Sequence, residues 1–246
     1  MPKETRVATG VPGLDEMLSG GFVPGTAILV RGAPGCGKTS LSLQYLVHGA
    51  LNQEPGLLIS FEEFPASIHR DAESLGWNLS ELEESGQLHL MFTSPQVLLD
   101  SLASPTSALS RLMLEGGICR VAVDSITHLT RLTSDSVKLR AYYNTIINGF
   151  KREGVTTLLL GEESRAPHPR QEKGKLSFVV DAILLMRYVE VESAIQRAIV
   201  VLKMRGSDHA KEIRQVEIRK GGLVVTDLFE GRESILSGIS HRAGAR

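Results

Sequence analysis

The chain has 246 residues, of which 42% are hydrophobic, and its formal net charge is −1. This length can bury a full core in one domain, and the near-neutral charge argues against a general polyanion-binding protein. No apolar stretch reaches the roughly 18 residues that span a bilayer, and the N-terminus lacks the apolar segment of a signal peptide. The two cysteines, Cys36 and Cys119, fit a reducing compartment. We therefore expect one soluble, cytoplasmic domain over residues 1–246, without a membrane partner.

Apolar runs typical of strands alternate with amphipathic segments typical of helices. The expected strands are residues 27–31, 56–60, 88–92, 120–124, 155–160 and 182–189, and the expected helices are residues 39–50, 65–75, 106–115 and 134–153. Three further strands are expected at residues 194–204, 213–220 and 223–225, with a hairpin turn at Gly221 and Gly222. The pattern indicates an α/β fold, with a mainly parallel sheet flanked by helices and a C-terminal antiparallel extension. The polar tail from about Ser237 is expected to fray.

The first expected strand and helix are joined by the run Gly32-Ala33-Pro34-Gly35-Cys36-Gly37-Lys38-Thr39. This run matches G-x-x-x-x-G-K-[S/T], the Walker A phosphate-binding loop of many nucleotide hydrolases. Glycines let successive N–H groups turn toward phosphate oxygens. Lys38 can then reach the β- and γ-phosphates, and the Thr39 hydroxyl can ligate Mg²⁺. The helix that follows, with Ser40 in its first turn, presents its positive end to the same anion. We therefore expect these nine residues to bind a nucleotide.

Two of the expected strands end in carboxylates, which a nucleotide hydrolase needs. Asp124 ends the strand at residues 120–124 and would hold Mg²⁺ directly or through water; the alternative is a carboxylate that caps the next turn. Glu62 and Glu63 follow the strand at residues 56–60, and one of them could orient the attacking water. Ordinary exposed acids before the next helix are the alternative, and the residues alone do not decide between the two.

Two basic segments lie further along the chain. The loop at residues 161–175 follows a strand end, where α/β proteins place ligand contacts. It could face nucleic acid, although a solvated loop is the favoured alternative, and its basic residues are Arg165, Arg170, Lys173 and Lys175. Lys203 and Arg205 point to one face of their strand and could neutralise charge at the γ-phosphate. The alternative for this pair is a basic edge strand that resists aggregation.

Several segments resemble a known family. The run Thr9-Gly10-Val11-Pro12-Gly13-Leu14-Asp15 resembles the N-terminal segment of RecA-superfamily ATPases of the RadA and KaiC type. Three further runs resemble the KaiC type more closely: Phe61-Glu62-Glu63, Leu75-Gly76-Trp77 and Lys203-Met204-Arg205-Gly206-Ser207-Asp208-His209. The match extends in order from about Val7 to Gly238. The chain is therefore identified as a member of the KaiC-like ATPases with one such domain.

This resemblance implies a RecA-like core that binds ATP with Mg²⁺. It implies that Glu62 is the catalytic glutamate and Glu63 its neighbour. Lys203 and Arg205 match residues that reach across a subunit interface to the neighbour's ATP, and His209 matches a position in the same interface segment. For His209 an ordinary exposed loop histidine is an equal alternative. The family's homo-oligomer, usually a hexameric ring, is implied as well.

The resemblance also has one departure. The second domain of the two-domain clock members phosphorylates an adjacent Ser-Thr pair, and the matching positions here are Ser177 and Phe178. Phe178 has no hydroxyl, so a two-site phosphorylation cycle is excluded here and only autophosphorylation of Ser177 stays open.

The leading hypothesis is a Mg²⁺-dependent, homo-oligomeric ATPase whose slow turnover acts as a signal to an unidentified partner protein. One alternative is a DNA-binding recombinase paralogue of the RadA and RecA type. The near-neutral charge and the KaiC-like segment around Lys203 disfavour it. The other alternative is a nucleotide-switched scaffold with weak serine autokinase activity.

Overall fold

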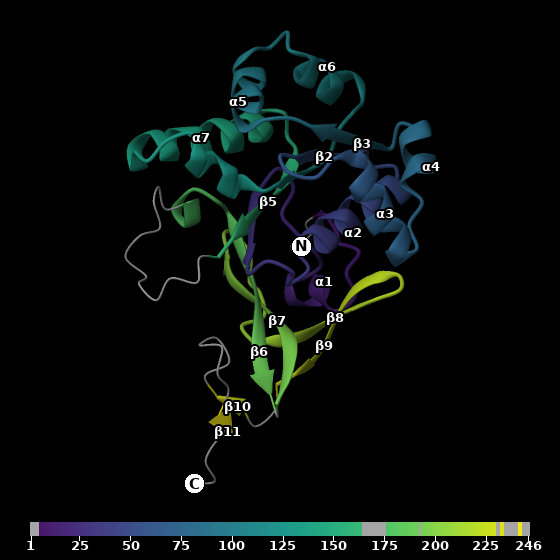
Figure 1. The fold of residues 1–246 in the computed structure, drawn as a ribbon, viewed down its shortest axis with the longest axis vertical. Coiled ribbons are helices and arrows are strands. Elements are labelled where there is room, and N and C mark those ends of the chain that lie inside the picture. The colour runs from purple at the N-terminus through teal and green to yellow at the C-terminus, as the bar shows by residue number, and fades with distance from the viewer. Residues whose placement is uncertain (1–4, 164–175, 192, 230–231, 234–240, 243–246) are drawn as a thin grey trace.

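The computed structural model describes residues 5–163, 176–191, 193–229, 232–233 and 241–242 (Figure 1). Within these residues, nine strands form one sheet in the order β3-β2-β4-β5-β1-β6-β7-β8-β9. The pairs from β3 to β6 are parallel, and the pairs from β6 to β9 are antiparallel. The predicted fold class, a mainly parallel sheet with a C-terminal antiparallel extension, is therefore confirmed.

The elements have the following bounds. The strands are β1 Ala27–Gly32, β2 Gly56–Ser60, β3 Leu88–Phe92, β4 Arg120–Asp124, β5 Thr156–Glu162, β6 Ala182–Val191, β7 Ala194–Met204, β8 Arg214–Arg219, β9 Gly222–Leu228, and the short pair β10 Arg232–Glu233 and β11 His241–Arg242. The helices are α1 Leu14–Met17, α2 Lys38–Leu51, α3 Pro65–Leu75, α4 Leu79–Glu84, α5 Pro95–Ala103, α6 Ala108–Glu115 and α7 Ser136–Arg152, with 3-10 helices η1 Ile126–Arg131 and η3 Leu176–Phe178.

Helices cover both faces of the parallel part of the sheet (Figure 1). All five residues of β2 are buried, as expected for a strand with a helical layer on each side. Leu57 and Ile59 pack in a cluster with apolar residues of α5, α6 and α7. Leu58 points to the other face and packs with residues of α1, α2, α3 and α4. This alternation along β2 follows from the two-residue period of a strand.

The structure adds elements that the apolar pattern did not predict: η3, the short pair β10 and β11, and the elements α1, α4, α5 and η1, of which the last four lie before β5 in the chain. Each is short, and α5 and η1 begin at side-chain caps, which hydrophobic periodicity does not reveal. The Ser94 side chain accepts a hydrogen bond from the backbone of Val97 at the start of α5, where Pro95 occupies the first turn. Ser125 caps η1 in the same way through the backbone of Thr127.

The hairpin between β8 and β9 differs by one residue from the predicted turn. Gly222 pairs with Arg219, so the two turn residues are Lys220 and Gly221. Gly221 has a φ of 94°, and such a positive angle favours glycine in a two-residue turn. Its N–H donates to the carbonyl of Leu75 at 2.7 Å. The hairpin is therefore fixed to the C-terminus of α3.

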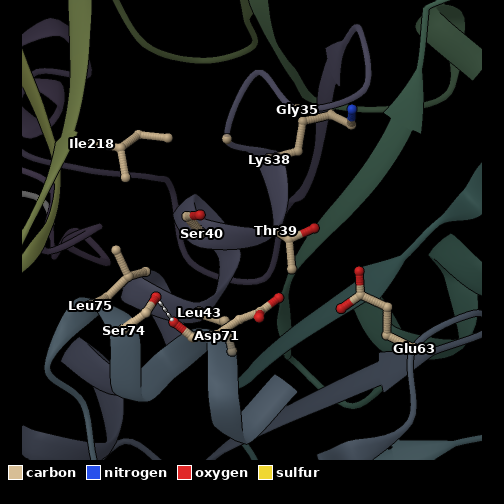
Figure 2. A pocket seen from close by; sticks show the side chains of 11 residues that line it. Gly35, Lys38, Thr39, Ser40, Leu43, Glu63, Asp71, Ser74, Leu75 and Ile218 are labelled. Atoms are coloured by element: carbon tan, nitrogen blue, oxygen red, sulfur yellow. Dashed lines mark hydrogen bonds between the residues drawn. The ribbon is translucent and has the colours of Figure 1, made fainter. Parts of the chain in front are cut away.

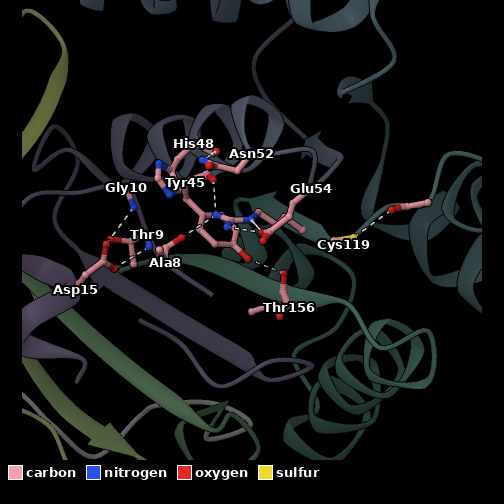
Figure 3. Close-up of polar contacts among 12 residues, drawn as sticks. Ala8, Thr9, Gly10, Asp15, Tyr45, His48, Asn52, Glu54, Cys119 and Thr156 are labelled. Carbon is pink, nitrogen blue, oxygen red and sulfur yellow. Dashed lines mark hydrogen bonds and ion pairs between the residues drawn. The ribbon is translucent and has the colours of Figure 1, made fainter. Parts of the chain in front are cut away.

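A buried cation connects the start of β4 to α2 and to the N-terminal segment, and Figure 3 labels its partners Ala8, Tyr45 and Glu54. Arg120 is 1% exposed and donates to the Glu54 carboxylate at 2.7 Å and to the backbone carbonyls of Ala8 and Tyr45 at 2.8 and 2.9 Å. Its guanidinium lies 4.7 Å from the centre of the Tyr45 ring. Gly49 leaves the space for this side chain, because a Cβ there would lie 2.4 Å from Cδ of Arg120.

Candidate nucleotide-binding site

The glycine-rich run at residues 32–39 forms the connection from β1 to α2. Gly35 and Gly37 have φ angles of 78° and 104°, in the left-handed region that favours glycine. A Cβ at Gly37 would lie 2.9 Å from Cδ1 of Ile218 in β8. The Cys36 side chain is fully buried, so this residue can meet a ligand only through its backbone. α2 starts without a side-chain cap, and its first N–H groups can therefore bind an anion.

Lys38 lies inside this loop rather than in solvent. Its side chain is only 8% exposed, and Nζ donates to the carbonyls of Gly32 at 2.9 Å and Ala33 at 3.0 Å. The loop thus places a buried ammonium group beside the start of α2. An ammonium that keeps only carbonyl partners is a suitable donor for phosphate oxygens.

Thr39 and Asp124 come together although they are far apart in the sequence. β4 lies one strand away from β1, with β5 between them. The Thr39 hydroxyl donates to Oδ2 of Asp124 at 2.7 Å. Burial raises the pKa of Asp124, whereas the hydrogen bond from Thr39 and the charge of Lys38 lower it.

These two side chains fit a Mg²⁺ ion. Neighbouring ligands of an octahedral ion with bonds of about 2.0–2.1 Å lie about 2.9 Å apart, close to the separation of the two oxygens. A buried carboxylate whose pKa is raised also gains from a cation. Thr39 and Asp124 would therefore hold the ion, with water and phosphate oxygens as its remaining ligands.

A pocket of about 390 Å³ opens beside the loop (Figure 2). It is lined by Gly35, Gly37, Lys38, Thr39, Ser40, Leu43, Glu63, Asp71, Ser74, Leu75 and Ile218. Its volume falls within the range of ligand pockets. The loop supplies one wall, α3 supplies another, and Ile218 supplies an apolar contact from β8.

The two adjacent glutamates have different surroundings. Glu63 lines the pocket, and its carboxylate lies on the side of Thr39 (Figure 2). Burial raises the pKa of Glu63, and the negative charge of Asp124 raises it further. Glu62 is outside the lining residues, and its Oε1 contacts Nε2 of His128 at 2.7 Å and the Arg131 guanidinium at 3.2 Å. The structure thus separates the two carboxylates that the sequence left as a pair.

Lys203 and Arg205 lie at the opposite end of the sheet from the glycine-rich loop. Nζ of Lys203 donates to the carbonyls of Ser177 and Val180 at 2.9 and 2.7 Å, and Arg205 donates to the carbonyl of Phe178 at 2.9 Å. Burial and the charge of Arg205 lower the pKa of Lys203. The structure therefore brings Lys203 and Arg205 close to each other and to the backbone of Ser177. Neither cation lies in the pocket of its own chain.

The remaining predicted positions lie away from the pocket or outside the described residues. His209 follows β7, and the adjacent Ala210 donates to the carbonyl of Met17 at the end of α1. Within the described part of the chain, Nδ1 of His209 is buried without a hydrogen-bond partner. The basic residues of the predicted nucleic-acid loop, Arg165, Arg170, Lys173 and Lys175, lie outside the described residues.

Sequence reasoning missed several residues of this site: Asp71, Ser74, Leu75, His128, Arg131 and Ile218. The only local signal was proximity to a strand end, since His128 and Arg131 follow Asp124 by four and seven positions. The others reach the site through the packing of α3 and β8.

In the part of the chain that the structure describes, no helix is long and apolar enough to cross a membrane.

The fold and the loop geometry define a RecA-like P-loop ATPase domain. The family model described as "ATPase: KaiC" matches residues 7–230. The chain is 36% identical over 244 residues to the circadian clock oscillator protein KaiC of Prochlorococcus marinus (strain MIT 9313), covering 96% of this chain and 47% of that protein. It is 34% identical over 235 residues to the protein of the same name from Parathermosynechococcus lividus, covering 95% of this chain and 43% of that protein.

The chain therefore belongs to the KaiC ATPase family, and the resemblance read from its sequence is confirmed. It spans about half the length of the curated relatives that it matches. Membership of the family supports an ATP-binding function for the domain.

Proposed function

We propose that this chain binds ATP with Mg²⁺ in the pocket beside α2 and hydrolyses it slowly, as a homo-oligomeric regulatory switch. The observation that carries the proposal is the contact of 2.7 Å between the Thr39 hydroxyl and Asp124, next to the buried ammonium of Lys38. A cation held by Thr39 and Asp124 would lie beside phosphate groups held by Lys38, as phosphoryl transfer requires.

In this proposal the loop N–H groups and Lys38 bind the β- and γ-phosphates, while Thr39 and Asp124 hold Mg²⁺. An ion held by these two residues would supply positive charge to the phosphate oxygens. Water attacks the γ-phosphorus as the bond to the bridging oxygen breaks, and ADP leaves with the electron pair. The water proton passes to a glutamate and then to inorganic phosphate. We assign the glutamate role to Glu62 from the family resemblance, and Glu63 is a residue of the pocket wall.

The oligomeric part of the proposal rests on the place of Lys203. Lys203 in β7 pairs with Ile183 in β6, and Ile183 pairs in turn with Leu29 in β1. Leu29 precedes Gly32, the first residue of the glycine-rich loop, by three positions. Lys203 is therefore roughly 10 Å from the loop along the strands and roughly 10 Å to the side across two strand spacings. Such an offset prevents contact with its own nucleotide. Lys203 and Arg205 would instead serve the ATP of a neighbouring subunit, as in a hexameric ring.

The decisive experiment is ATP turnover per subunit as a function of protein concentration, with Mg²⁺ present. We expect turnover to rise steeply with concentration and to fall to background without Mg²⁺, because the neighbour completes the site. Turnover that stays constant down to concentrations where light scattering shows monomers would reject the shared site. An absence of both ATP binding and turnover would reject the function itself.

A further inference from the structure

The carboxylate of Glu62 is held by two side chains of η1, the segment that follows Asp124. Nε2 of His128 lies 2.7 Å from Oε1 of Glu62, and the guanidinium of Arg131 lies 3.2 Å from the same oxygen. The three residues come from two neighbouring strand ends, because β2 and β4 are paired along their length. This cluster adjoins the pocket but is not part of its wall.

The histidine is the fixed member of this contact. Its side chain is 8% exposed, and its ring lies 6.1 Å from the ring of Phe61. The backbone of His128 donates to the carbonyl of Ser125 at 3.1 Å. The Glu62 side chain is 53% exposed and is therefore the member that can move.

The charges around the pocket favour the same position of Glu62. Its negative charge raises the pKa of both Asp124 and Glu63, so the three carboxylates repel one another. Moving Glu62 toward the pocket would bring like charges closer and would remove its contacts with His128 and with the Arg131 guanidinium. Both effects hold the carboxylate at η1.

We propose that His128 and Arg131 form a latch that holds the Glu62 carboxylate away from the γ-phosphate and thereby limits the rate of hydrolysis. The inference rests on the proposed function, because it assigns the slow turnover to a contact within that site. His128 is a positioning residue, and in this proposal its effect on the rate of hydrolysis passes through Glu62. Breaking one hydrogen bond to a charged group changes a rate by about ten- to a hundredfold.

The test is steady-state phosphate release by the full chain at a concentration where the oligomer forms. In His128→Ala, kcat for ATP should rise about tenfold with KM unchanged. Arg131→Ala should raise kcat two- to threefold, because exposed ion pairs are weak. His128→Gln keeps an N–H donor near the position of Nε2 and should restore the wild-type rate. Combined with Glu62→Gln, the His128→Ala change should have no effect, since the residue acts through that carboxylate.

A matched control is His69→Ala, because His69 and Glu83 form a contact of the same length, 2.7 Å, between α3 and α4. This variant should keep the wild-type kcat. A lower kcat in His128→Ala would mean that the histidine orients Glu62 for reaction, and an unchanged kcat would mean that the contact is without consequence; either result overturns the latch.

Two further results separate the causes of failure. If melting shows that His128→Ala does not fold, Arg131→Ala takes its place, because the Arg131 side chain is 71% exposed and its removal should leave the fold intact. An unchanged kcat in Arg131→Ala then overturns the latch. Phosphate release that is absent from the wild type and from every variant would reject the proposed hydrolysis together with the latch. Wild-type release that the latch variants leave unchanged would reject the latch alone.

Discussion

The two ends of β4 contain charges of opposite sign, a buried one at Arg120 and a partly buried one at Asp124, and their surroundings differ. Arg120 at the amino end donates to Glu54 and to two backbone carbonyls. Asp124 at the carboxyl end accepts one hydrogen bond from Thr39 and lies near two other carboxylates. The charge of Glu62 raises the pKa of Asp124, and the charge of Asp124 raises the pKa of Glu63. Removing a buried charge that has several partners leaves those partners unsatisfied and destabilises the fold. A partly buried charge among like charges is suited to binding a cation, and this difference separates the structural end of β4 from the end to which we assign the proposed site.

Two lysines extend the comparison. Lys38 and Lys203 each donate to two backbone carbonyls, yet they lie at opposite ends of the parallel strands. Lys38 is beside Asp124 and the pocket. Lys203 is beside Arg205 and the residues that precede β6. The same local chemistry therefore serves the chain's own pocket in one case and, in our proposal, a neighbour's pocket in the other.

The largest effect is expected at the carboxyl end. Glu62→Gln should lower kcat by about 10²- to 10⁴-fold, because the water loses its proton acceptor, while the Kd for ATP changes little. Phosphate release and nucleotide titration measure the two quantities, with Glu84→Gln on the far end of α4 as the control. Full activity in Glu62→Gln and loss of activity in Glu63→Gln would give the role to the pocket-lining glutamate instead.

A change at the amino end should affect stability rather than chemistry. Arg120→Met leaves Glu54 and the carbonyls of Ala8 and Tyr45 without their donor, so the free energy of unfolding should fall by about 3–5 kcal/mol. Denaturant titration measures this loss, and Arg111→Met on the exposed side of α6 should change stability by less than about 0.5 kcal/mol. A loss of ATP affinity without a loss of stability would contradict the division between the two ends.

Lys203 should be the exception to that division. Lys203→Ala should lower kcat by about tenfold or more, because a cation that stabilises transition-state charge is lost, with little change in ATP binding. Mixing Lys203→Ala subunits with Glu62→Gln subunits should recover part of the activity, since some interfaces then combine an intact Lys203 with an intact Glu62. A mixture that stays as inactive as its components would argue against action across an interface.

The smallest effect concerns pH. The pKa of Asp124 is raised above its ordinary value of 3.8, chiefly by burial. The contribution of this group to the free energy of unfolding is therefore fully present below pH 3.8, where the carboxyl is protonated in both states. It is lost as the pH rises through the folded-state pKa, because the charged form is then favoured in the unfolded chain. Without nucleotide, Asp124→Asn should melt about 2 °C higher than the wild type at pH 7, and the difference should shrink toward pH 4.

Melting curves between pH 4 and pH 8 measure this trend, and the exposed Asp100→Asn variant serves as the control. A variant at position 124 that is less stable than the wild type at every pH would mean that the hydrogen bond from Thr39 outweighs the burial of the charge. In the presence of Mg²⁺ and ATP the order should reverse, because the variant loses a ligand of the ion.

Much of the fold could be predicted because its signals are local. The strands at Gly56–Ser60, Leu88–Phe92 and Arg120–Asp124 have the predicted bounds, since each is a short apolar run between turn residues. The turn at Gly221 was displaced by one residue, because pairing register rather than composition decides which residue closes a hairpin. The roles assigned to the site residues stay predictions until the experiments above are done.

The sequence by itself determined the glycine-rich loop, because strand, loop and helix are consecutive and their spacing fixes how N–H groups, Lys38 and Thr39 meet an anion. It also determined the family. The tertiary structure alone decided that Glu62 faces His128 while Glu63 faces the pocket, and that Lys203 lies at the far end of the sheet from its own loop. These contacts join residues distant in the chain, so they depend on strand order and register, which no local pattern encodes.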